Sequence, residues 1–108
     1  MKIKTDEFAS SEVRRTARRM AKVVRQARLA RRMPQTELAA RARTSPQTVM
    51  RIEAGSSAAS LGAWLSVMEQ LGLLKLLSDL RDSASEELLS QHKTRRARLN
   101  TPDKDMNF

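Results

Sequence analysis

The stretch "TSPQTVMRIEAG", residues 44–55, contains a helix with a marked start and a marked end. Ser45 can cap the helix with its hydroxyl, Pro46 suits the first helical position, and Gly55 suits the residue just past the end. At about 100° per residue, one side carries two apolar residues and a carboxylate, on Val49, Ile52 and Glu53. The opposite side carries one amide, one guanidinium and otherwise apolar groups, on Gln47, Met50, Arg51 and Ala54. Such a surface is better suited to contacting another molecule than to contacting water alone.

The residues before this stretch predict two more helices. Between about residues 10 and 32, apolar residues recur at three- and four-residue intervals, at Val13, Ala17, Met20, Val24 and Ala27. Pro34 ends this helix, because proline cannot continue it. Residues 35–42, "QTELAARA", then form a short helix with an apolar side of Leu38, Ala39 and Ala42. Only the three residues of "RTS", 43–45, join it to the next helix.

The residues after Gly55 predict a fourth helix and an association surface. Ser60 caps the helix, whose apolar stripe is Leu61, Trp64, Leu65, Met68 and Leu71. The following "LGLLKLLSDL" is too rich in leucine for the surface of a small monomer. It therefore predicts a dimer interface formed by Leu73, Leu74, Leu76, Leu77 and Leu80.

The C-terminal residues predict a different kind of structure. From Ser83 we expect a short helix over "SEELLSQH", residues 85–92, followed by a disordered tail, because "KTRRARLNTPDKDMNF" is polar, charged and almost without apolar residues. Strand signals are nearly absent along the whole chain. We therefore predict an all-α protein with a folded domain at residues 1–82 and a flexible charged tail at 83–108.

The composition argues against several functional classes. The 108 residues allow one core and are too few for two. The chain has no cysteine, only one histidine, His92, and no phosphate-binding glycine loop, so we expect no metal, no cofactor and no enzyme active site. It also has no signal-peptide pattern and no run of about 18 apolar residues. We expect a cytoplasmic, nucleoid-associated protein that does not enter a membrane.

The positive charge is concentrated in the first half of the chain. The net charge is +9, and residues 1–55 carry 14 Lys and Arg against 5 Asp and Glu, whereas residues 56–108 carry 7 of each. Most of the cations in the first half are arginines, which suit bidentate contacts with phosphate. The pattern favours a nucleic-acid-binding surface, with a solvated basic helix or a binder of anionic membranes as the alternatives.

The order of these helices is the helix-turn-helix arrangement, in which the second of two short helices enters the DNA major groove. Residues 23–55, "VVRQARLARRMPQTELAARARTSPQTVMRIEAG", resemble the Xre/Cro-type helix-turn-helix family of bacterial and phage repressors. The resemblance continues through "SLGAWLSVMEQLGLL". It implies a five-helix, lambda-repressor-like DNA-binding domain.

The resemblance also implies roles for individual residues. It implies that Arg28 and Glu53 form a structural ion pair. The positions that it assigns to DNA contact are Gln35, Thr36, Ser45, Pro46, Gln47, Thr48, Met50 and Arg51. Their chemistry fits, since glutamine pairs well with adenine and arginine with guanine. Arg32 and Arg43 stand where the family has turn glycines. Because arginine in a left-handed turn costs about 1 kcal/mol or more, we expect another turn geometry there.

The leucine-rich segment and the short charged tail narrow the resemblance to HipB-type antitoxins, the DNA-binding partners of HipA-family kinase toxins. This implies a homodimer that binds a palindromic operator, represses its own operon and holds the toxin. Its two recognition helices would lie about one DNA turn (~34 Å) apart. Two alternatives stay open: a stand-alone Xre-family repressor without a toxin partner, and a basic factor that bridges proteins or RNA.

Overall fold

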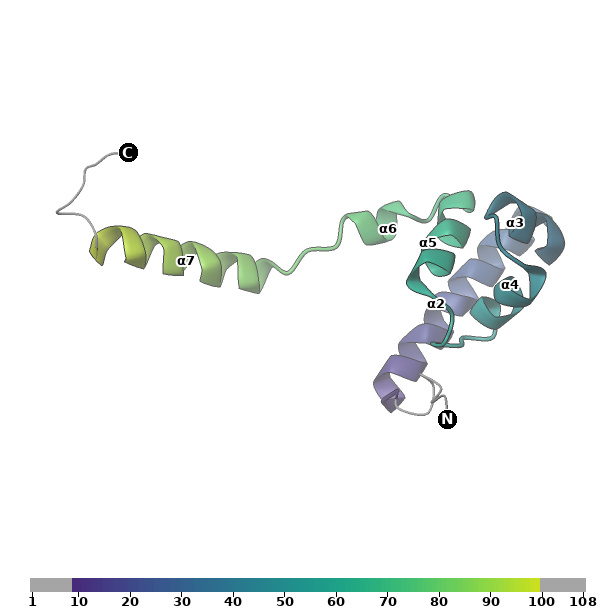
Figure 1. The fold of residues 1–108 in the computed structure, drawn as a ribbon, viewed down its shortest axis with the longest axis horizontal. Helices are drawn as coiled ribbons and strands as arrows, with labels where there is room; N and C mark the ends of the chain where they lie inside the picture. Colours follow the sequence, from purple (N-terminus) through teal and green to yellow (C-terminus); the bar gives the residue numbers. More distant parts are fainter. Residues whose placement is uncertain (1–8, 100–108) are drawn as a thin grey trace. The chain divides into compact units, whose positions relative to one another are not determined.

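The computed structural model describes residues 9–99, which form two units that divide after Ser78. The first unit contains α2 (Ser11–Ala30), α3 (Gln35–Arg41), α4 (Pro46–Glu53), α5 (Leu61–Gln70) and α6 (Lys75–Ser78), and the second contains α7 (Ser83–Leu99) (Figure 1). The described residues contain no strand. The predicted all-α class is confirmed, with five helices in the first unit.

The core of the first unit lies where α2, α3, α4 and α5 meet. In Figure 1, α2 runs diagonally, with α3 and α4 on one side of it and α5 on the other. The largest fully buried side chains are Val24, Leu38, Val49, Ile52, Val67 and Leu71. The apolar sides predicted for α3 and α4 are therefore the buried sides. Each of these four helices contributes at least one fully buried residue to a single core.

Two residues of the predicted apolar stripes are instead exposed. Val13 is 49% exposed and Leu61 is 71% exposed. Val13 lies in the first turn of α2 and Leu61 is the first residue of α5, so both lie at helix ends beyond the center of the core. Ala21 and Val67, which the predicted stripes left out, are buried at 2% and 0% exposure.

Four successive helices, α2 to α5, end in the same hydrogen-bonded turn. The residue after each C-cap, the second past the helix end, has a left-handed backbone, with φ of 52° at Arg32, 55° at Arg43, 82° at Gly55 and 73° at Gly72. The amide of each donates to the carbonyl three residues earlier, and the amide of the next residue donates to the carbonyl five residues earlier. These are the two hydrogen bonds of the Schellman motif. The expectation of another turn geometry at Arg32 and Arg43 is wrong.

The reason for the left-handed arginine is clearest after α2. Met33 follows Arg32 and is 8% exposed, packed in the core. Its amide donates to the carbonyl oxygen of Arg28 at 3.2 Å. The buried methionine and the two turn hydrogen bonds together outweigh a conformational cost of about 1 kcal/mol.

The second unit contains α7, which has no buried residue. At its start, the carboxylate of Asp82 accepts hydrogen bonds from the hydroxyl and the amide of Ser85, and these bonds lower the pKa of Asp82. Arg81 and Glu86 form an ion pair whose hydrogen bond lowers the pKa of the Glu86 carboxyl.

The helix α7 is longer than the sequence predicts. It continues past His92 to Leu99, where we expected disorder. Residues 93–99 contain mostly strong helix formers and neither glycine nor proline. The positive charges of Arg96 and Arg98 in the last turn interact favourably with the helix dipole and stabilise the helix end. The disorder predicted for residues 100–108 lies outside the described residues.

Candidate nucleic-acid interface

The helix α4 is fixed at both ends. At its start, the hydroxyl of Ser45 accepts a hydrogen bond from the amide of Thr48 at 3.1 Å, and the two hydroxyls are 2.9 Å apart. Pro46 occupies the first helical position, as predicted. At its end, the Schellman turn contains Gly55. The hydroxyl of Ser45 therefore already caps the helix, and the hydroxyl of Thr48, also predicted to contact DNA, is hydrogen-bonded to it.

The inner side of α4 sets its rotation. Val49 and Ile52 are both 0% exposed and belong to the core. Because these two residues fix which side is buried, the opposite side must face outward. Gln47, Met50, Arg51 and Ala54 are exposed and line a hollow of about 370 Å³. We call Gln47, Met50 and Arg51 the reading face.

An ion pair ties the end of α4 to α2. The Arg28 guanidinium donates from Nε to Oε2 of Glu53 at 2.6 Å and from Nη2 to Oε1 at 2.9 Å. The side chains are 10% and 4% exposed. The hydrogen bonds with Glu53 raise the pKa of Arg28 above its ordinary value, so the arginine stays charged. Removing one partner of such a pair leaves an uncompensated buried charge.

Two further hydrogen bonds extend this ion pair into a network. Arg28 Nη1 donates to the carbonyl oxygen of Met33 at 2.8 Å, in the turn after α2. Gln35 Nε2 donates to Glu53 Oε1 at 3.1 Å. The network therefore joins α2, the turn after it, the first residue of α3 and the last residue of α4. It fixes the start of α3 relative to the recognition helix.

The sequence predicts only a DNA contact for Gln35 and does not reveal its hydrogen bond to Glu53. No local signal could have revealed it, because 18 residues separate the two side chains. Gln35 is half-buried, and Thr36 beside it is exposed. Pro34 stands at the cap position of α3, which has no side-chain cap hydrogen bond.

The cations of α2 lie close to α4. At about 100° per residue, one flank of α2 carries four basic side chains, Arg14, Arg18, Lys22 and Arg25. We call these four residues the basic flank. A Cβ atom at Gly55 would lie 2.8 Å from Cγ and 3.0 Å from Cα of Arg18. Arg18 of the basic flank therefore lies against the turn that follows α4.

The five leucines predicted to form a dimer interface differ in their surroundings. Leu73 and Leu77 are partly buried and pack against the core, and Leu74 is half-buried. Leu76 is 66% exposed, and Leu80 is 76% exposed but lies in the second unit. The structure therefore does not bring the five side chains together as one exposed surface of the first unit.

Within residues 9–99, no helix has both the length and the apolar character needed to cross a membrane. The same residues contain no cluster of three or more His, Cys, Asp or Glu side chains that could hold a metal ion.

Comparison with known proteins gives a match to the segment that contains α4 and the ion-pair network. Residues 24–76 match the family model described as "Helix-turn-helix". Comparison with curated proteins gave no significant match, and comparison with solved structures gave none either. The matched segment includes α3, α4 and α5 and the second part of α2. Residues 24–76 are therefore similar to helix-turn-helix domains of the Xre/lambda-repressor-like kind, which are DNA-binding regulatory domains.

Proposed function

We propose that the chain is a sequence-specific transcriptional repressor that reads base edges with the reading face of α4. The observation that carries this proposal is the rotation of α4, which buries Val49 and Ile52 fully and exposes Gln47, Met50 and Arg51 together. A glutamine amide can bind adenine with two hydrogen bonds, and an arginine guanidinium can bind guanine in the same way. The exposed Met50 offers an apolar contact to a thymine methyl group.

In this proposal, the phosphate contacts come from the starts of α3 and α4. Gln35 and Thr36 lie at the first, and Ser45 and Thr48 at the second. Pro46, also at the second, has no N–H and can contact the DNA backbone only with its ring. The start of α3 has no side-chain cap, so the amides of Gln35 and Thr36 can donate to a phosphate oxygen, whereas the amides of Glu37 and Leu38 already donate to the carbonyl oxygen of Pro34. Positive charge on the basic flank adds attraction for the DNA backbone, so binding should weaken steeply as salt rises.

We also propose a finer role, which rests on the resemblance of the leucine-rich segment to HipB-type antitoxins. The chain binds a palindromic operator as a homodimer, represses its own operon and holds a HipA-family kinase toxin. The exposed Leu76 supports an association surface in the first unit. A homodimer matches a palindrome because both have two-fold symmetry.

The test is fluorescence anisotropy with a duplex from just upstream of the gene and a scrambled duplex, at two salt concentrations. We expect tight binding to the native duplex only, with a salt slope of several phosphates. Arg51→Ala should weaken specific binding about 5- to 150-fold, which corresponds to about 1–3 kcal/mol. The control is Arg95→Ala, which removes an exposed arginine from α7. Equal binding to both duplexes would favour the bridging-factor alternative.

A further inference from the structure

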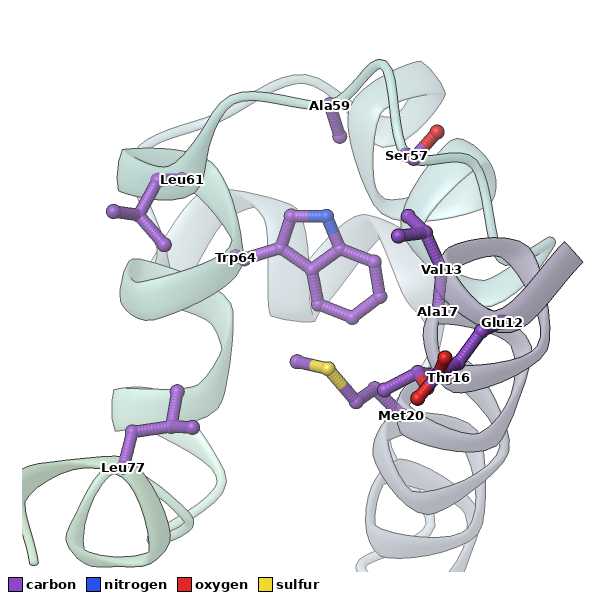
Figure 2. A pocket seen from close by; sticks show the side chains of 10 residues that line it. All are labelled: Glu12, Val13, Thr16, Ala17, Met20, Ser57, Ala59, Leu61, Trp64 and Leu77. Carbon is purple, nitrogen blue, oxygen red and sulfur yellow. The ribbon is translucent and has the colours of Figure 1, made fainter. Parts of the chain in front are cut away.

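The first unit has an apolar groove away from the reading face. It has a volume of about 540 Å³, and its apolar lining includes Val13 and Met20 of α2, Leu61 and Trp64 of α5, and Leu77 of α6 (Figure 2). The indole of Trp64 spans the space between α5 and α2 and is 7% exposed. Val13 and Leu61, at 49% and 71% exposure, lie at the rim.

The groove depends on a part of the chain outside the helix-turn-helix match. The match begins at residue 24, whereas α2 begins at Ser11 and is 20 residues long. All five α2 residues that line the groove precede the match: Glu12, Val13, Thr16, Ala17 and Met20. The N-terminal part of α2, which precedes the helix-turn-helix match, thus supplies one wall of the groove.

The groove is also free of cations, unlike the other side of α2. None of its lining residues is lysine or arginine, and Glu12 is its one charged residue. The basic flank lies on the opposite side of the same helix. The helix α2 therefore has a cationic side that suits a polyanion and an apolar side that does not.

We propose that a second copy of this chain docks in the groove. Each copy carries a net charge of +9, and two such chains repel one another wherever their cations meet. A cation-free apolar surface is the kind of surface through which they can associate. The groove also combines a hollow beside Trp64 with a projecting leucine, Leu61, as the self-complementary surface of a two-fold dimer requires.

This inference rests on the proposed homodimer and names its surface. It moves the center of the interface from the run of leucines between Leu73 and Leu80 to the groove between α2 and α5. Leu77 contributes because it lines the groove, and the exposed Leu76 adjoins it in the sequence. Leu73 instead packs against the core of its own chain.

The test is sedimentation of the full chain over a range of concentrations. Leu61→Lys places a cation at the rim without disturbing the core, since Leu61 is 71% exposed. Val13→Lys does the same on the opposite wall. The matched control is Leu29→Lys, which changes a leucine 52% exposed on the other side of α2.

We expect the native chain and Leu29→Lys to form dimers, and the two groove variants to raise the dimer dissociation constant at least tenfold. A native chain that stays monomeric, groove variants that dimerise normally, or equal weakening by Leu29→Lys would each overturn the inference. Anisotropy with the native and scrambled duplexes separates this outcome from failure of the proposed function. If the groove variants still form dimers and the chain still binds the native duplex more tightly than the scrambled one, the groove is not the dimer interface, but the proposed DNA reading stands.

Discussion

Replacing Gly55 or Gly72 with alanine tests how tightly α4 is held against α2. The two glycines occupy the same position in equivalent Schellman turns, with φ of 82° and 73°. A left-handed alanine costs about 1–2 kcal/mol, and about 0.4–1 kcal/mol of that is offset because alanine restricts the unfolded chain. At Gly72 the nearest atom to a new Cβ is Arg31 Nη2 at 3.9 Å, an ordinary contact. Gly72→Ala should therefore lower the free energy of unfolding by about 1 kcal/mol.

Gly55→Ala should cost considerably more. Its Cβ would lie 3.0 Å from the Cα of Arg18, a backbone atom that cannot move without moving α2. Forcing an extra carbon into such a contact typically costs about 1–3 kcal/mol. We therefore expect a total loss of about 2–4 kcal/mol, and a difference of about 1–3 kcal/mol between the two variants.

Urea unfolding followed by circular dichroism at 222 nm measures both variants. The slope of the free energy against urea should stay constant, so that a shift in midpoint reports stability alone. Equal losses for Gly55→Ala and Gly72→Ala would refute the reasoning. They would mean that the contact with Arg18 does not constrain α4, and that Val49 and Ile52 hold the helix without it.

Three further changes test the network, the turns and α7. Glu53→Gln should lower the free energy of unfolding by about 3–5 kcal/mol, because it leaves Arg28 buried without a countercharge; urea unfolding measures this. Arg43→Gly should raise stability, by up to about 1 kcal/mol, because glycine adopts the left-handed turn without strain; an unchanged or lower midpoint would contradict this. The pKa values of Asp82 and Glu86 are lowered in the folded chain, so the two carboxylates stabilise the fold at pH values above their ordinary pKa values of 3.8 and 4.5. This contribution is lost as the pH falls through the lowered values, so backbone NMR shifts should show α7 fraying in acid.

The helix α4 could be predicted from the sequence because its signals are local. A hydroxyl cap at Ser45, proline at the first position, glycine after the end and an apolar period all lie within a dozen residues. The buried side followed from the same period, since Val49 and Ile52 lie on one arc. Local signals of this kind determine both the bounds of the helix and the residues that it exposes.

The turns at Arg32 and Arg43 could not be predicted from local preferences alone. Arginine disfavours a left-handed backbone, so the residue type argues against the turn that forms. The turn after α2 forms because the side chain of Met33 packs in the core. Tertiary packing overrides the preference of one residue, and this packing is visible only once the helices are placed together.

The groove shows the same limitation on a larger scale. Leu61 and Trp64 belong to one predicted stripe, yet they are 71% and 7% exposed. Periodicity gives the direction of a side chain around its own helix and does not give the length over which a neighbouring helix covers it. The groove exists because α2 extends beside α5, a relation between residues more than 40 positions apart.

The placement of Gln35 links the two kinds of DNA contact in the proposed function. Phosphate contacts set the position of a protein on the duplex, and base contacts read the sequence. Glu53, at the end of α4, accepts hydrogen bonds from both Arg28 and Gln35, so one carboxylate orients the recognition helix and the first residue of α3 together. A displacement of α4 would therefore also displace a predicted phosphate contact. Stability and base preference should change together when this network is altered, whereas Arg51→Ala should change base preference alone.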